Sequence, residues 1–153
     1  MARRRALENL KIAGHSPLPS PEEIQRLFPV TQAAEKTVRA ARAALKDILE
    51  GRDRRLFLVV GPCSIHDPKA ALEYARRLRA LSELVSDRFL IAMRVYFEKP
   101  RTTLGWKGYI NDPFMNDSFH IEEGLKRARQ LLLKITGLGL PAATEALDPV
   151  TPQ

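Results

Sequence analysis

The sequence is short of several residue types and patterns, and each shortage excludes a class of protein. A single cysteine stands among its 153 residues, so no internal disulfide framework can form, and a lone thiol suits a reducing cytoplasm. No apolar run approaches the roughly eighteen residues that a membrane-spanning helix needs. The basic first residues are not followed by the apolar segment of a secretory signal. We therefore expect a cytoplasmic protein with no membrane partner.

Positive charge, by contrast, is in excess, with 25 Lys and Arg against 18 Asp and Glu and a net charge of +7. A basic surface, or the basic arm at positions 3–5, would explain this charge without any function. An anionic partner, either nucleic acid or a phosphorylated metabolite, is the functional explanation. The positions of the charges favour the second: Arg94, Lys99, Arg101 and Lys107 fall within fourteen residues of one segment.

Hydrophobic periodicity predicts strands that alternate with helices. Strands are expected at 56–60, 89–95 and 141–147, the first two as continuous apolar runs typical of strands buried on both faces. Helices are expected at 20–28, 31–51, 67–86 and 118–137. The predicted helix caps are Ser20 (with Glu23 in a capping box), Asp67 and Ser118. Two helices followed by strand, helix, strand, helix and strand indicate an α/β fold with a parallel sheet.

The sequence ends soon after the third predicted strand. Three parallel strands with helices fit either a small open sheet or the first part of an eight-stranded barrel, which typically needs about 250 residues. An uncovered edge strand would favour aggregation. We therefore expect the chain to be a fragment, with an arm and helices at 1–52 and the sheet-forming part at 53–153.

Unusual residues follow each predicted strand, in "GPCSIHDP", "RVYFEKPRTT" and "TEALDP". Ligands of parallel α/β folds gather at the carboxyl ends of the strands. Cys63 is either a small buried apolar residue or a thiolate that acts as nucleophile or metal ligand. Arg94, at the end of a buried strand, would need an anion to pair with.

The segment after the second strand has the donors that a phosphorylated acid or sugar requires. The guanidinium group of Arg presents several N–H donors in one plane, and the ammonium group of Lys is a compact charge that also donates hydrogen bonds to oxygen. Thr102 adds a hydroxyl group. The other interpretation is a solvated basic loop, and Trp106 and Tyr109 are expected to pack that loop down. Glu145 is either a carboxylate with a surface or capping role, or a group that orients Lys99 or Arg94 or binds a water molecule.

The motifs "GPCSIHDP", "MRVYFEKPRTTLGWKGYINDP" and "LPAATEALDPVTPQ", with "FPVTQAAEKTV" before them, resemble the type I 3-deoxy-D-arabino-heptulosonate 7-phosphate (DAHP) synthases, also called phospho-2-dehydro-3-deoxyheptonate aldolases. The resemblance extends through nearly the whole chain. It implies the first three β/α units of a TIM barrel. An N-terminal helical extension precedes them and has a role in regulating the enzyme or in forming the oligomer. It also implies a metal-dependent condensation of phosphoenolpyruvate with erythrose 4-phosphate, the first step of the shikimate pathway of aromatic amino acid biosynthesis.

The resemblance assigns roles residue by residue. Cys63 would be a ligand of a divalent metal (Mn, Fe, Co or Zn) that acts as a Lewis acid on the aldehyde oxygen. Lys99 would contact both substrates and donate a proton or hydrogen bond as charge develops. The residues expected to bind substrate are Arg94 and Glu145 for phosphoenolpyruvate, and Pro100, Arg101 and Thr102 for erythrose 4-phosphate.

The resemblance also implies what this chain lacks. The remaining metal ligands (a His, a Glu and an Asp) and several phosphate-binding residues of the family lie beyond Gln153, so we expect the chain alone to be inactive. A homodimer or homotetramer, and feedback inhibition by tyrosine or phenylalanine, are expected of the full-length protein. The alternatives are another phosphosugar-binding barrel enzyme, a non-catalytic regulatory fragment, and, least favoured for want of any recognised motif, a nucleic-acid-binding module.

Overall fold

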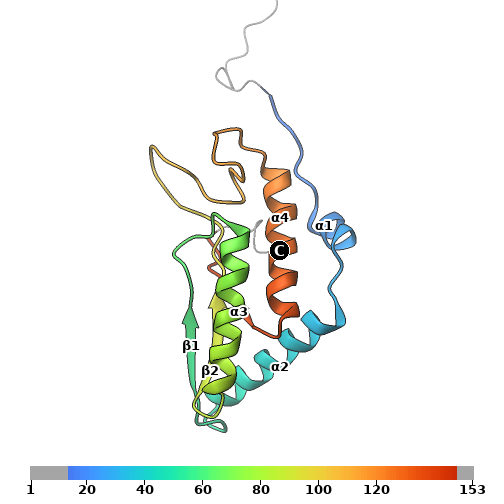
Figure 1. Cartoon of the computed structure of the whole chain (residues 1–153). Helices are drawn as coiled ribbons and strands as arrows, with labels where there is room; N and C mark the ends of the chain where they lie inside the picture. The colour runs from blue at the N-terminus through green and yellow to red at the C-terminus, as the bar shows by residue number, and fades with distance from the viewer. Residues whose placement is uncertain (1–13, 148–153) are drawn as a thin grey trace, which may run out of the picture.

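The computed structural model describes residues 14–147, and the expected basic arm at 3–5 lies outside them. Within these residues the elements are, in order, α1 (Pro21–Leu27), α2 (Gln32–Leu49), β1 (Leu56–Val60), α3 (Pro68–Leu84), β2 (Phe89–Arg94), α4 (Ile121–Gly137) and β3 (Ala142–Ala143). Figure 1 labels all of them except β3. The strands form a parallel sheet in the order β1-β2-β3. The predicted α/β alternation is therefore confirmed.

Local capping explains where three of the helices begin. At α1 the Ser20 hydroxyl group accepts from the Glu23 backbone N–H, and the Glu23 carboxylate accepts from the Ser20 N–H. The Thr31 hydroxyl group accepts from an N–H in the first turn of α2, and the Asp67 carboxylate does the same at α3. Each cap satisfies amide groups that a helix start leaves unpaired. The predicted caps at Ser20 and Asp67 are confirmed.

The predicted cap at Ser118 is wrong. Helix α4 begins at Ile121, three residues later, and its N-cap position makes no side-chain hydrogen bond. The Ser118 backbone N–H instead donates to the Asn116 side chain at 3.2 Å, and Asp117 and Phe119 have left-handed φ values of 58° and 51°. Left-handed φ values lie outside the right-handed helical region, so the helix cannot begin before Phe119 has been passed.

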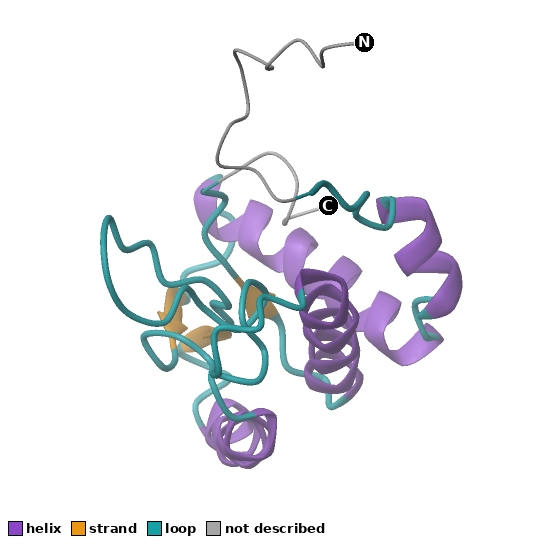
Figure 2. Ribbon diagram, turned by 90° about the horizontal axis from the view of Figure 1, so that it is seen from above, coloured by secondary structure: helices purple, strands orange, loops and turns teal. Residues whose placement is uncertain are grey.

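One face of the sheet carries the core. Ile91 and Met93 of β2 pack toward α3 and α4, and both are at most 6% exposed. Helices α3 and α4 run along the strands and are seen nearly end-on in Figure 2, while α2 packs across α4. The buried residues of the two covering helices are Ala71, Ala75 and Leu78 of α3 and Ala128, Leu131 and Ile135 of α4. None of the helices within residues 14–147 has the length and apolar content to cross a bilayer.

Two of the strand predictions need correction. β1 was expected to be buried on both faces, yet Leu56, Leu58 and Val59 are 63%, 37% and 45% exposed. The reason is that β1 lies at the edge of the sheet and has a strand neighbour on one side only. The third strand, expected at 141–147, is reduced to Ala142–Ala143, because only those two residues pair with Met93 and Arg94.

Candidate functional site

The loops after β1 and β2 are bound to each other at the carboxyl end of the sheet. The Ile65 N–H donates to the Tyr96 carbonyl oxygen at 2.7 Å, and the Ser64 hydroxyl group donates to the Glu98 carbonyl oxygen at 2.8 Å. A Cβ atom at Gly61 would lie 2.4 Å from the Arg94 carbonyl oxygen, so only glycine allows the two chains to approach this closely. The "GPCS" turn is thereby fixed beside the end of β2.

Arg94, the last residue of β2, is held by acceptors from both other strand ends. Its guanidinium group donates to the carbonyl oxygens of Pro62 at 2.9 Å and Cys63 at 2.5 Å, and to the Glu145 carboxylate after β3 at 2.5 Å. The Glu145 carboxylate also raises the pKa of Arg94 above its ordinary value. Arg94 thus pairs with the carboxylate of Glu145, as one interpretation of Glu145 predicts, while the binding of an anionic ligand by Arg94 stays a prediction. The side chain remains 24% exposed, so a ligand can still reach it.

Cys63 lies on the surface and contacts a lysine. Its Sγ is 3.0 Å from the Lys99 Nζ, across 36 residues of sequence. Hydrogen bonding and charge from Lys99, with a smaller contribution from Arg94, lower the pKa of the Cys63 thiol below its ordinary value. A neighbouring cation favours the thiolate, which is the form that acts as nucleophile or metal ligand. The interpretation of Cys63 as a buried apolar residue is wrong.

The long loop from 95 to 120 is folded back on itself. Lys99 N–H donates to the Lys107 carbonyl oxygen at 3.1 Å, and Gly108, at φ 106°, lies so close to Glu98 that a Cβ atom would be 2.5 Å from its Cα. Tyr109 is 2% exposed, and the indole N–H of Trp106 donates to the Asp112 carbonyl oxygen. The expectation that these two aromatic residues pack the loop down is confirmed.

The remaining cations of the loop have different roles. The Lys107 ammonium group donates to the carbonyl oxygens of Arg101 and Thr103, so it stabilises the loop. Pro100, Arg101 and Thr102 are exposed, and the Arg101 side chain lies over Gly105. Within residues 14–147, none of these three makes a side-chain hydrogen bond to Cys63, Arg94 or Lys99. The structure thus brings Cys63, Arg94, Lys99 and Glu145 into contact, whereas no described side-chain hydrogen bond joins the Pro-Arg-Thr segment to Cys63, Arg94 or Lys99.

The sequence interpretation missed one member of this cluster, Tyr96. The Arg94 Cζ lies 4.7 Å from the centroid of its ring, and burial raises the pKa of the Tyr96 phenol. Its hydroxyl group is buried and has no hydrogen-bond partner among the described residues. A residue two positions after Arg94 falls on the same side only where the chain stays extended, and Tyr96 lies beyond the end of β2, so the sequence alone does not place its ring.

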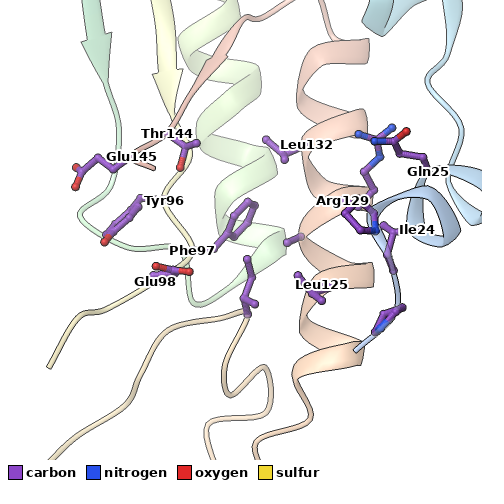
Figure 3. Close-up of a pocket in the computed structure, with 14 residues that line it drawn as sticks. Ile24, Gln25, Tyr96, Phe97, Glu98, Leu125, Arg129, Leu132, Thr144 and Glu145 are labelled. Carbon is purple, nitrogen blue, oxygen red and sulfur yellow. The ribbon is translucent and has the colours of Figure 1, made fainter. Parts of the chain in front are cut away.

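A cavity of about 150 Å³ lies behind this cluster, between α1, α4 and the strand ends. Figure 3 shows Tyr96, Glu98 and Glu145 on one side of it and Ile24, Gln25 and Arg129 on the other. Most of its lining is apolar, and Cys63, Arg94 and Lys99 do not contribute to it. The cavity therefore lies beside the cluster of Cys63, Arg94 and Lys99, and it shares Tyr96 and Glu145 with that cluster.

The described residues do not by themselves fit a metal ion. A soft divalent ion typically takes three or four protein ligands, and no group of three His, Cys, Asp or Glu residues within 14–147 is placed to hold one. Cys63 can supply one ligand at most.

Comparisons with known proteins show the family to which the chain belongs. The model of the DAHP synthetase I family matches residues 28–153. The chain is 56% identical over 148 residues to the Tyr-sensitive phospho-2-dehydro-3-deoxyheptonate aldolase of Salmonella typhimurium, covering 97% of the chain and 42% of that protein. It is 56% identical over 146 residues to the Phe-sensitive aldolase of Escherichia coli, covering 95% of the chain and 42% of that protein.

A solved structure shows the same relationship. The phospho-2-dehydro-3-deoxyheptonate aldolase of Francisella tularensis superposes with a TM-score of 0.88 at 48% identity, over 92% of this chain and 41% of that one. The chain thus spans about two fifths of the length of the relatives described here. With the family model matching most of its residues, the chain belongs to the DAHP synthetase I family.

Proposed function

We propose that the chain forms the N-terminal part of a DAHP synthase, which condenses phosphoenolpyruvate with erythrose 4-phosphate to DAHP and phosphate. One observation supports this most: Cys63, Arg94, Lys99 and Glu145, from the ends of three parallel strands, form a single contact cluster. The proposal includes the finer architecture, in which the three strands are the first units of a TIM barrel whose active site lies at the carboxyl ends of its strands.

Arg94 binds phosphoenolpyruvate in this proposal. Its carbonyl and carboxylate acceptors direct the guanidinium group, while its exposed portion can pair with a carboxylate or phosphate oxygen. Glu145 is then a positioning residue for Arg94. The described residues around Arg94 thus supply a fixed positive group beside the thiolate.

Lys99 is the residue that handles the proton. An ammonium group has three donors, and only one of them is directed at the Cys63 sulfur. The other two can hold a substrate oxygen. As C3 of phosphoenolpyruvate forms a bond to the aldehyde carbon, Lys99 donates to the aldehyde oxygen, which becomes a hydroxyl group. Water adds at C2, and one of its protons replaces the proton that Lys99 gave up. The bond from C2 to the phosphate oxygen then breaks, C2 becomes the keto carbon of the product, and inorganic phosphate leaves with the second proton of the water.

Several further assignments belong to the same proposal. Pro100, Arg101 and Thr102 bind erythrose 4-phosphate once the exposed loop closes on it. Cys63 supplies one ligand to a divalent metal ion (Mn, Fe, Co or Zn), with the other ligands coming from beyond this chain. An aromatic amino acid regulates the full-length protein, as the names of the Tyr- and Phe-sensitive relatives suggest, and that protein is a cytoplasmic homodimer or homotetramer.

The proposal is tested in a chimaera in which the part of the Salmonella typhimurium aldolase that follows the matched region is joined after Gln153. We expect this chimaera to release phosphate from phosphoenolpyruvate only when erythrose 4-phosphate is present, and the 153-residue chain alone to release none. Lys99→Gln should lower kcat by a factor of about 10² or more, because general acid catalysis contributes that much.

Two controls make the outcome specific. Lys69→Gln removes a lysine on the exposed surface of α3 and should leave the rate unchanged. Cys63→Ala should reduce the metal bound by the purified chimaera, measured by elemental analysis. A folded chimaera that binds phosphoenolpyruvate but forms no DAHP, or that keeps its rate after Lys99→Gln, would refute the proposed reaction.

A further inference from the structure

We propose that Tyr96 is a positioning residue for Arg94: the face of its ring holds the guanidinium group at the tilt needed to bind the anionic groups of phosphoenolpyruvate. The inference rests on the proposed function, because it adds a residue to the same site. It is drawn from the placement of the two side chains, since no motif in the sequence singles out Tyr96.

The geometry of the pair carries the inference. The Arg94 Cζ lies 4.7 Å from the centroid of the Tyr96 ring, within the range of a cation–π contact. Arg94 ends β2 and Tyr96 follows it by two positions, and their contact shows that both side chains lie on the same side of the chain. The Ile65 N–H also fixes the Tyr96 carbonyl oxygen at 2.7 Å, so the backbone that carries the ring is anchored to the Cys63 loop.

The hydrogen bonds of Arg94 leave the tilt of its guanidinium plane weakly restrained, and the Tyr96 ring restrains that tilt. The guanidinium group donates to Pro62, Cys63 and Glu145 through its terminal nitrogens. N–H bonds of a guanidinium group lie in its plane, so these three contacts restrain its edge and leave its tilt weakly restrained. A buried ring against one face, at 5% exposure, restrains that tilt. The group is then presented to a ligand with one face already covered.

The ring, and not its hydroxyl group, is the part that matters for this role. Among the described residues the Tyr96 hydroxyl group is buried and unpaired. A buried hydroxyl group without a partner costs free energy, so no hydrogen bond within this part of the chain explains why the side chain lies here. Phenylalanine at this position should therefore hold Arg94 as well as tyrosine does.

The test compares Tyr96→Leu with Tyr96→Phe in the chimaera, measuring phosphoenolpyruvate binding by calorimetry together with KM and kcat. Loss of a partly desolvated cation–π contact should weaken phosphoenolpyruvate binding about tenfold in Tyr96→Leu, with a matching rise in its KM. The KM for erythrose 4-phosphate and kcat should each change by less than about twofold, since the proposed function assigns that substrate to Pro100, Arg101 and Thr102 and the proton to Lys99. Tyr96→Phe should keep the affinity of the unsubstituted chimaera.

Phe97→Leu is the matched control, because Phe97 is the next residue, is 6% exposed and belongs to the core on the other side of the chain. It should lower the melting temperature about as much as Tyr96→Leu and leave phosphoenolpyruvate affinity unchanged. Unchanged affinity in Tyr96→Leu, or an equal loss in Tyr96→Phe or Phe97→Leu, would overturn the inference. A chimaera that binds phosphoenolpyruvate without turnover refutes only the proposed reaction, and one that does not bind it overturns both.

Discussion

Strands β1 and β2 are both mainly apolar, yet their side chains are buried to different extents. Leu58 of β1 pairs directly with Ile91 of β2, and the two side chains are 37% and 6% exposed. Both are aliphatic residues of the same size on neighbouring strands, so composition cannot be the cause. The difference comes from position: β2 has a strand on each side and two helices against it, whereas β1 is an edge strand. Burial is therefore a property of the neighbours of a strand.

The largest expected effect tests this comparison directly. In the chain, Ile91→Ala should lower the free energy of unfolding by about 2–5 kcal/mol, as a large-to-small change in a closed core does. Leu58→Ala should cost only about 1–2 kcal/mol, because part of the side chain already contacts water. Urea denaturation followed by circular dichroism measures both. Equal costs would show that β1 is as well covered as β2.

A second and smaller effect sharpens the comparison where the two strands end. Gly61→Ala should lower stability by about 1–3 kcal/mol, because the new methyl group would have to displace the end of β2. Gly137→Ala is the control, since a Cβ atom there meets nothing within 4 Å. Thermal melting compares the two variants. If Gly61→Ala melts like Gly137→Ala, the close approach of the strand ends is wrong.

The smallest effect concerns the thiol of Cys63, which follows β1, and the ammonium group of Lys99, which follows β2. Lys99 lowers the pKa of Cys63, so the thiolate persists to lower pH than in an ordinary cysteine. Lys99→Gln should raise that pKa and move the pH profile of iodoacetamide labelling to higher pH. The single cysteine makes the readout unambiguous. Lys134→Gln, on the exposed end of α4, should leave the profile in place, and a shift there or none in Lys99→Gln would contradict the contact.

Predictions from the sequence succeeded where the cause is local. The cap at Asp67 depends on amide groups two and three residues away, and the apolar run of β2 is short and continuous, so both could be inferred. The prediction of a cap at Ser118 was wrong because Asp117 and Phe119 have left-handed φ values, which no local sequence pattern indicates. The third strand was predicted too long, since its length depends on what Met93 and Arg94 pair with.

The site was predictable in part for the same reason. Parallel strands bring their carboxyl ends to one edge, so the convergence of Cys63, Arg94, Lys99 and Glu145 followed from their positions after three strands. The contact of Lys99 with the sulfur, the folding of Lys107 onto loop carbonyl oxygens and the ring of Tyr96 beside Arg94 did not follow. Each depends on side-chain directions within loops that have no periodicity.

The amino-acid sequence by itself determined the alternation of strands and helices, two of its helix caps and the gathering of charge at strand ends. These features arise from hydrogen bonds and periodicities that span a few residues. Only the tertiary structure decided which strand is buried, that the thiol of Cys63 faces an ammonium group 36 residues away, and that an aromatic ring covers the guanidinium group of Arg94. Burial and electrostatic environment are set by atoms that are close in space and distant along the chain.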